Sequence, residues 1–315
     1  MLVLDGLPGQ DDEYEQDDDR SGTRRCAQAL GHGILACRGR RFDTGGGAGG
    51  VEFEGMMASS EPPPMLPFTI VVPTAYGPMM VNRYDVNQTN ALFKTGLAID
   101  HVEIVMLAQL MAVIGTDLTF LDIGANFGTY SIALARAVGA RGRVHAFEPQ
   151  RIIYNLLVGS VALNSLTNVY CYNVAVGDRE GRVEIPQFDY SKPLNFGSVE
   201  FSGTQREPLA QTPVRDPSRV EYVPLTTIDR FEFDKVHLMK IDAEGMELQV
   251  LDGAMKTLRR CRPVLYVEII KVDREQLRQK ILAENYAVYV NGINFLCIPT
   301  ELTDRIRIQP PPPRP

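Results

Sequence analysis

The residues best suited to chemistry stand in the stretch FLDIGANFGTYS, residues 120–131. Asp122 ends an apolar run, Gly124 and Gly128 follow in a tight turn, and helical spacing begins at about Thr129. Glycine allows positive φ and close backbone approach, and the start of a helix offers unpaired N–H groups with a positive partial charge. This arrangement predicts a ligand site where a strand passes into a helix.

The order of the glycines limits the ligand. A dinucleotide site prefers G-x-G-x-x-G, whose middle glycine lets a pyrophosphate lie on the backbone. Here Ala125, Asn126 and Phe127 separate the two glycines, so that middle glycine is missing and a nicotinamide dehydrogenase is disfavoured. A cationic ligand that bears an amino acid and no phosphate fits better, because Asp122 can face its ammonium while the helix start receives its carboxylate. S-adenosylmethionine (SAM) is such a ligand.

A second acid supports this interpretation. Glu148 ends the next predicted strand, VHAFE, 26 residues after Asp122. In α/β folds an acid in this place holds ribose hydroxyls. The two acids together therefore favour a ligand with a ribose, whereas an ordinary strand-to-helix loop would explain only the glycines.

A further group of acids lies in KIDAEGMELQVLDGA, residues 240–254. Asp242 is expected to end a strand, Glu244 to lie in the loop after it, and Glu247 to cap the next helix, where an acid complements the helix dipole. Two carboxylates at a ligand edge repel each other, so Asp242 and Glu244 are candidates to orient a hydroxyl, accept its proton or steady a sulfonium charge. Glu268, in the strand YVEII, either joins them or pairs with an arginine inside the fold.

Other polar residues leave alternatives open. Asn195 lies in PLNFGSVEF, residues 193–201, which is either a loop over the substrate or a hairpin turn. The histidines lack the spacing of metal ligands, and we expect His145 and His237 to be structural. The pair Asp242 and Glu244 could bind magnesium, but no third clustered ligand is evident, so we expect no metal.

The candidate site residues must be positioned by the surrounding fold. Over residues 118–300, predicted apolar strands alternate with helical segments. The alternation implies right-handed crossovers and a mostly parallel sheet with helices on both faces, which places a ligand at the carboxyl ends of the strands. A closing antiparallel hairpin is expected around Asn291 and Gly292. The predicted strands are residues 117–124, 142–149, 168–176, 236–245 and 262–270. The predicted helices are residues 128–139, 151–163, 246–258 and 274–286. Residues 181–223 form a polar, β-rich insertion, called the β-rich excursion below.

The ends of the chain differ in composition from this core. Residues 1–64, with the acidic run DDEYEQDDD and GGGAGG, are predicted to be a disordered tail, and Met56 or Met57 could equally be the start. Residues 65–117 add a hairpin and a helix over about residues 98–114 that could lean over the ligand edge. The predicted domain is thus residues 65–300, with a SAM-binding core over residues 118–300 and a proline-rich tail over residues 301–315.

Composition narrows the class of protein. The formal net charge is −7, but the first 64 residues hold twelve acids against six arginines, which leaves 27 acids and 26 bases in the rest. A nearly neutral body is a poor nucleic-acid binder. Five cysteines without a C-x-x-C pair suit a reducing cytoplasm, and neither a signal peptide nor a membrane span is indicated.

Taken together, these motifs resemble those of FkbM-type methyltransferases, SAM-dependent enzymes with a class I Rossmann-like α/β fold. The likeness rests on FLDIGANFGTYS, VHAFEP, VPLTTIDRF, KIDAEGMELQVLDGA and VLYVEI in this order, and it covers roughly residues 75–295. It implies that Asp242 stands close to the reactive methyl. It also implies a cofactor site in which the methionine end of SAM lies at Asp122, Gly124, Ala125, Asn126 and Gly128, the ribose at Glu148 and the adenine near Ala175.

The resemblance implies O-methylation of a hydroxyl on a sugar, lipid or secondary-metabolite acceptor. Two alternatives stay open: an enzyme of the same fold that methylates nitrogen or protein side chains, and a SAM-binding module without chemistry. Neither the acceptor nor the oligomeric state follows from the sequence.

Overall fold

The computed structural model describes residues 66–201, 205–206, 209–213 and 220–306. The predicted N-terminal tail, the two candidate start methionines and most of the proline-rich tail lie outside the described residues. One compact unit contains the chain from Pro67 onward, and the fold described here is that of this unit.

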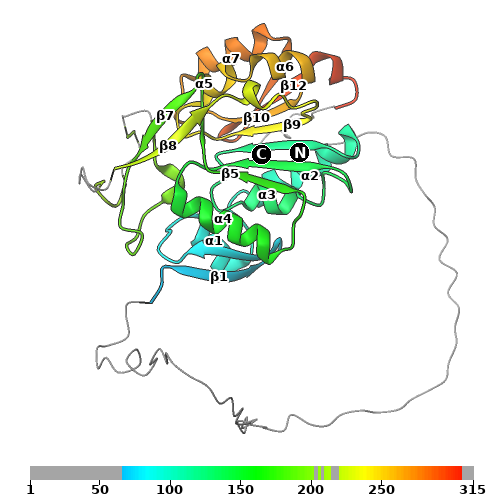
Figure 1. Cartoon of the computed structure of the whole chain (residues 1–315). Helices are drawn as coiled ribbons and strands as arrows, with labels where there is room; N and C mark the ends of the chain where they lie inside the picture. Colours follow the sequence, from blue (N-terminus) through cyan, green and yellow to red (C-terminus); the bar gives the residue numbers. More distant parts are fainter. Residues whose placement is uncertain (1–65, 202–204, 207–208, 214–219, 307–315) are drawn as a thin grey trace, which may run out of the picture. The chain divides into compact units, whose positions relative to one another are not determined.

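A seven-stranded sheet forms the centre of this unit (Figure 1). Its strand order is β11-β12-β10-β9-β3-β4-β5, and β12 runs antiparallel to both of its neighbours while the strands from β10 to β5 are parallel. The predicted α/β class, with a mostly parallel sheet and a C-terminal antiparallel hairpin, is confirmed. The strands are β3 (Thr119–Ile123), β4 (Arg143–Phe147), β5 (Val169–Tyr172), β9 (Leu238–Ile241), β10 (Val264–Glu268), β11 (Tyr286–Asn291) and β12 (Asn294–Pro299).

Helices cover both faces of the sheet. Phe120 of β3 packs into a core with helices α2, α3 and α4, whereas its neighbour Leu121 packs into a second core with α5, α6 and α7. Successive side chains of a strand point to opposite faces, so strands that are apolar throughout can bury both faces. The helices are α1 (Gln88–Thr95), α2 (His101–Ile114), α3 (Thr129–Leu134), α4 (Arg151–Leu163), α5 (Glu247–Asp252), α6 (Met255–Cys261) and α7 (Arg274–Ala283).

Three predicted elements are shorter or divided. The helix predicted from Gly128 ends at Leu134, and the helix predicted over residues 246–258 is split into α5 and α6. Gly253 stands at this split, where an added Cβ would lie 1.9 Å from the carbonyl oxygen of Gly177. The strand predicted over residues 168–176 divides into β5 and β6, because Asn173 turns the chain by donating to the carbonyl oxygens of Glu148 and Pro149 at 2.9 and 3.0 Å.

The predicted β-rich excursion forms a small side sheet. Its strands are β6 (Ala175–Val176), β7 (Gly181–Ile185) and β8 (Glu221–Thr226), in the order β6-β8-β7. Between β7 and β8 the chain makes a short 3₁₀ turn, η2 (Phe196–Ser198), and the segment before it forms a parallel bridge from Leu194 to Asp85. This bridge ties the excursion to the N-terminal part of the unit.

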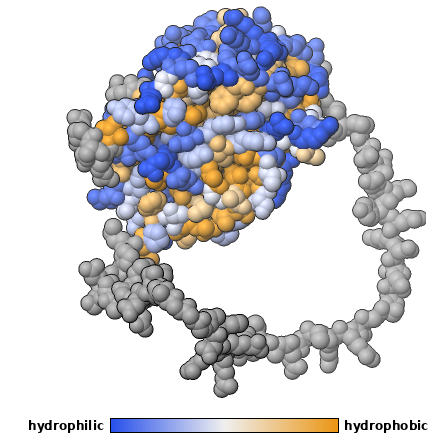
Figure 2. All heavy atoms as spheres, viewed as in Figure 1, coloured by the Kyte–Doolittle hydropathy of each residue, from blue (hydrophilic) through white to orange (hydrophobic). Residues whose placement is uncertain are grey.

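The N-terminal hairpin packs against α4. Its strands are β1 (Thr69–Thr74) and β2 (Gly77–Asn82), and the hydroxyl oxygen of Ser160 accepts from the N–H of Met80 at 2.8 Å. Helix α2 confirms the predicted helix before residue 117, while α1 was not predicted. Figure 2 shows hydrophilic residues over α6 and α7 and hydrophobic residues gathered in the lower part of the same face. Among the described residues, no helix is long and apolar enough to cross a membrane.

Candidate functional site

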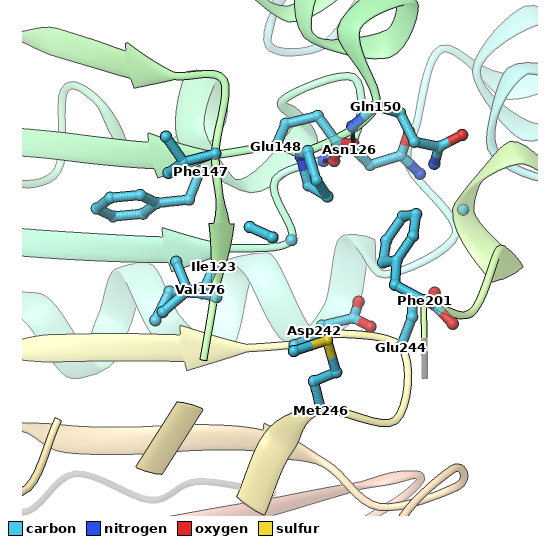
Figure 3. Close-up of a pocket in the computed structure, with 16 residues that line it drawn as sticks. Ile123, Asn126, Phe147, Glu148, Gln150, Val176, Phe201, Asp242, Glu244 and Met246 are labelled. Atoms are coloured by element: carbon cyan, nitrogen blue, oxygen red, sulfur yellow. Dashed lines mark hydrogen bonds between the residues drawn. The ribbon is translucent and has the colours of Figure 1, made fainter. Parts of the chain in front are cut away.

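Two adjoining cavities open at the carboxyl ends of the central strands. The first, of about 550 Å³, lies at the ends of β3 and β4, and the second, of about 880 Å³, extends from β9 and β10 toward the start of α2. Figure 3 shows Glu148 and Asn126 on one side of the first cavity and Asp242 and Met246 on the other. The two cavities share Asn126, Gly197, Asp242 and Glu244.

The glycine turn joins three strand ends. Gly124 has a φ of 77°, and a Cβ there would lie 1.7 Å from the carbonyl oxygen of Asp242, so the turn can touch the loop after β9 only because residue 124 lacks a side chain. The N–H groups of Gly124 and Ala125 both donate to the carbonyl oxygen of Phe147 at 3.0 Å. These two N–H groups are therefore already bonded within the protein. A ligand would fit the shape of the turn and would not need these N–H groups as donors. Gly128 is the N-cap of α3, where a Cβ would lie 2.4 Å from Leu157.

Glu148 is buried in the wall of the first cavity. Its two carboxylate oxygens accept from the N–H of Asn126 at 2.9 Å and the N–H of Gln150 at 2.8 Å, which fixes the side chain. Burial raises the pKa of Glu148 to about 7, although these two hydrogen bonds oppose the shift. Each carboxylate oxygen has a further lone pair, so Glu148 can also accept two hydroxyl groups from the cavity.

Two other oxygens in this cavity lack partners. Asn126 Oδ1 and Gln150 Oε1 are buried without a hydrogen bond among the described residues, and both side chains line the cavity. Gln150 Nε2 donates to the carbonyl oxygen of Phe196 at 2.7 Å, which leaves its oxygen available as an acceptor. Sequence reasoning missed Gln150, although its place two residues after the ribose-binding candidate was a usable signal. The remaining wall is mostly apolar and includes Phe147, Val174, Ala175, Val176, Phe201 and Met246.

The first predicted acid lies beneath this cavity. Asp122 is fully buried and is not among the residues that line either cavity. One of its carboxylate oxygens accepts from the hydroxyl of Ser131 at 2.6 Å, and the other lies 3.6 Å from the Nζ atom of Lys240. The cation next to Asp122 is thus a side chain of the protein. Direct contact between Asp122 and a cofactor stays a prediction.

Lys240 lines the second cavity and was also missed. Its Nζ atom lies 3.2 Å from Asp242 Oδ2, donates to the carbonyl oxygen of Gly124 at 3.0 Å and stands 5.0 Å from the ring centre of Tyr130. Burial would lower the pKa of Lys240, but Asp242 and Asp122 outweigh it and raise that pKa above its usual value. A buried ammonium therefore holds Asp242 against the glycine turn.

The predicted catalytic acids meet in the second cavity. Asp242, Glu244 and Glu268 all line it, and Glu244 forms an ion pair with Lys271. Burial and the nearby Asp242 raise the pKa of Glu244, and burial with both neighbouring carboxylates raises the pKa of Glu268 to about 10. Glu268 Oε2 has no hydrogen-bond partner among the described residues, so the structure supports neither an arginine partner nor a structural bond for this oxygen.

Glu247 lies in the first turn of α5, as predicted, but its side chain bonds the preceding loop and does not cap the helix. It is the first residue of α5, and its Oε1 atom accepts from the N–H groups of Ala243 and Gly245 at 3.0 and 3.1 Å. These bonds hold the loop that carries Glu244, whose φ of 53° lies in the left-handed region. The loop conformation is thereby fixed at an energetic cost of order 1 kcal/mol.

The segment with Asn195 lies between the cavities. It forms the η2 turn rather than a hairpin turn, and Asn195 lines the second cavity while donating to the Ser198 hydroxyl at 2.6 Å. A Cβ on Gly197 would lie 2.7 Å from Asn126 Nδ2, so the turn closes directly on the glycine turn of β3.

The histidines make contacts within the fold. Nδ1 of His237 accepts from the N–H of Thr119 at 2.9 Å, and Nδ1 of His145 lies 2.9 Å from the Tyr172 hydroxyl. No group of three His, Cys, Asp or Glu side chains in the described part of the chain could hold a metal ion.

Comparisons with known proteins show the family to which the chain is similar. The family description "Methyltransferase FkbM domain" matches residues 122–289. A methyltransferase, sdnD of Sordaria araneosa, is 26% identical over 155 residues, which cover 42% of this chain and 59% of that protein. The chain thus matches less than two thirds of this relative's length.

Solved structures are more distant. A methyltransferase FkbM from Methylobacillus flagellatus KT shares 17% identity with a TM-score of 0.41, over 68% of this chain and 48% of that chain. A tRNA (uracil-54, C5)-methyltransferase from Pyrococcus abyssi, solved with S-adenosylhomocysteine, shares 14% identity with a TM-score of 0.36, over 70% and 39%. The family description covers more than half of the sequence and spans the glycine turn, Glu148, Asp242 and Glu268. The chain therefore belongs to the FkbM methyltransferase domain family.

Proposed function

We propose that this chain is a SAM-dependent methyltransferase that acts on a hydroxyl oxygen of a sugar, lipid or secondary-metabolite acceptor. The observation that carries the proposal is the placement of Glu148. Its fixed, buried carboxylate lines a cavity that shares Asp242 and Glu244 with a second, larger cavity. One cavity suits a nucleoside cofactor and the other an acceptor.

The residues of the first cavity fit SAM. Glu148 would accept the ribose hydroxyls, and the unpartnered oxygens of Asn126 and Gln150 would accept from the amino group. The apolar wall near Ala175 would hold the adenine. Asp122 supports this site from beneath through Ser131 and Lys240, in addition to its predicted contact with the cofactor. Bound SAM supplies an electrophilic methyl group on a sulfonium.

Asp242 is the proposed proton acceptor for the acceptor hydroxyl. It lines both cavities, and Lys240 fixes one of its oxygens at 3.2 Å. Glu244 is less suited to this task, because its carboxylate is already engaged in the ion pair with Lys271. Glu244 is therefore proposed to position the hydroxyl, and Asn195 and Glu268 to contact the rest of the acceptor. Alignment of the reacting atoms supplies much of the rate in such a transfer, and a general base adds about a hundredfold to ten-thousandfold.

The acceptor class is supported by charge. A body with 27 acids and 26 bases beyond residue 64 favours a small acceptor over a nucleic acid. We also propose a cytoplasmic location, since Cys171, Cys261 and Cys297 are free thiols. Fractionation of cells that express the full chain tests this location.

Incubation with methyl-labelled SAM and fractionated small molecules tests the function. Asp242→Asn should lower the rate of methyl transfer by about a hundredfold to ten-thousandfold while SAM affinity, measured by calorimetry, changes less than threefold. Asp252→Asn is the matched control, because Asp252 is an exposed residue of α5 paired with Lys280. An Asp242→Asn enzyme with unchanged turnover would refute the assignment. A labelled product that carries the methyl on nitrogen or protein would correct the acceptor class, and SAM binding without any product would indicate a binding module.

A further inference from the structure

The second cavity combines buried charged groups with exposed isoleucines at its opening, where Asn87 is also exposed. Lys240, Glu268 and Lys271 are buried in its wall, with exposures of 6, 8 and 3%. Ile99, Ile270 and Ile293 line the same cavity but are 49, 47 and 51% exposed. The polar groups thus lie inside and the isoleucines at the opening.

The three isoleucines come from separate parts of the chain. Ile99 precedes α2, Ile270 follows β10, and Ile293 lies in the turn between β11 and β12. The N–H of Ile269 donates to the carbonyl oxygen of Ile293 at 2.9 Å, which holds two of these segments together. We name these three side chains the isoleucine rim. Single exposed apolar residues need no explanation, but apolar side chains gathered at the mouth of a ligand cavity can bind an apolar group.

The interior requires a ligand with oxygen atoms. Glu268 is more than nine-tenths buried, and its Oε2 atom has no hydrogen-bond partner among the described residues. A buried polar atom without a partner costs about 1–3 kcal/mol, which a bound hydroxyl would recover. An anionic head group is disfavoured, because both lysines of the wall already have a carboxyl partner, Lys240 in Asp242 and Lys271 in Glu244.

We propose that the acceptor is an amphiphile whose neutral, hydroxylated head enters the second cavity and binds Glu268, while its apolar body lies on the isoleucine rim. A fully polar acceptor would leave the rim in water, and a fully apolar one would leave Glu268 without a partner. This inference rests on the proposed function for the role of the head as methyl acceptor.

Binding of alkyl β-D-glucosides to the full chain saturated with S-adenosylhomocysteine tests the inference. The probes are the methyl, hexyl, heptyl and octyl glucosides below their micelle concentrations, measured by calorimetry. Affinity should rise about threefold to fourfold for each methylene from hexyl to octyl, because each buried methylene contributes to transfer from water. Glu268→Ala should weaken all chain lengths by about fivefold to thirtyfold and leave this slope unchanged.

The triple variant Ile99→Asn, Ile270→Asn, Ile293→Asn should remove the dependence on chain length. Val290→Asn is the control, because Val290 is 59% exposed on β11 and does not line the cavity. The inference is overturned if no glucoside binds, if affinity is independent of chain length, or if the control loses the slope as the triple variant does. Such a result with normal binding of S-adenosylhomocysteine leaves the proposed function standing, whereas failure to bind S-adenosylhomocysteine overturns both.

Discussion

Glu148 and Glu268 are buried carboxyl groups, and ionisation of either one opposes the stability of the free protein. Burial raises the pKa of both groups, which means that the folded state binds their protons more tightly than the unfolded chain does. Such groups concentrate at sites where a ligand or a reaction uses them. Lys240 is their counterpart, a buried ammonium whose charge is balanced by Asp122 and Asp242.

Glu268→Gln should make the unfolding free energy less dependent on pH. The pKa of Glu268 rises from about 4.5 in the unfolded chain to about 10 in the fold. Its contribution to stability is therefore complete below pH 4.5 and is lost as pH rises toward 10. We expect the unfolding free energy of the variant to match that of the parent at pH 5 and to exceed it by at least about 2 kcal/mol at pH 9, which corresponds to at least roughly 4 °C in the thermal midpoint by calorimetry.

The control for this prediction is Glu275→Gln, which changes an exposed carboxyl of α7. It should shift the unfolding midpoint equally at both pH values. The groups that act on Glu268 are Asp242, Glu244, Glu247 and Lys271. A Glu268→Gln protein that is less stable than the parent at pH 9 would contradict the prediction.

Sequence reasoning found some of these residues and missed others for a physical reason. Glu148 and Asp242 could be found because each directly follows an apolar strand, and all parallel strands end at one edge of the sheet. Lys240 is the partner of Asp122 in the register of β9 with β3, and a single sequence does not reveal which strands are neighbours. Its spacing of two residues from Asp242 was the available signal, since both point to the same face.

At the scale of elements, the site depends on one backbone contact between the ends of β3 and β9. Gly124→Ala should disrupt this contact, because the new Cβ would lie 1.7 Å from the carbonyl oxygen of Asp242. We expect a loss of more than about 3 kcal/mol of unfolding free energy in urea titration and loss of SAM binding.

Gly96→Ala is the matched control for the contact. Gly96 has a φ of 71°, close to the 77° of Gly124, but an added Cβ there meets nothing within 4 Å. The Gly96→Ala protein should therefore lose only the unfolding free energy that backbone strain costs, about 1–2 kcal/mol, and should still bind SAM. Equal losses in the two variants would show that the contact with Asp242 has no role of its own.

The divided elements were not predictable from local pattern. The apolar spacing of residues 246–258 continues through Gly253, yet the helix is divided there, at a point where the carbonyl oxygen of Gly177 approaches from another segment. Helix α4, which meets no such interruption, has the bounds that its spacing predicts, Arg151–Leu163. Periodicity shows which face of an element is buried, but a contact from a distant segment decides where the element ends.

At the scale of the whole molecule, the two cores on either side of the sheet hold its carboxyl edge rigid and leave the function to the loops. This separation explains why the fold could be predicted while the acceptor could not. The strands and helices follow from apolar periodicity, whereas the second cavity is also lined by α1, the η2 turn and the three isoleucines of the rim, which come from distant segments. Only one of these parts, the loop with Asn195, was a candidate in the sequence.

Ligand binding to the first cavity should stabilise the whole described unit, because the cofactor would join the ends of β3, β4 and β9, which are bonded to one another through Asn126, Glu148 and Lys240. S-adenosylhomocysteine at a hundred times its Kd should add about 2.7 kcal/mol to the unfolding free energy of the full chain. This gain corresponds to roughly 5–11 °C in the thermal midpoint.

Glu148→Gln should retain less than half of the shift, measured against its own ligand-free midpoint, because one ribose acceptor becomes a donor. NADH should produce no shift, since the turn from Gly124 to Gly128 lacks the middle glycine that a pyrophosphate needs. A larger shift with NADH than with S-adenosylhomocysteine would contradict the assignment of this cavity.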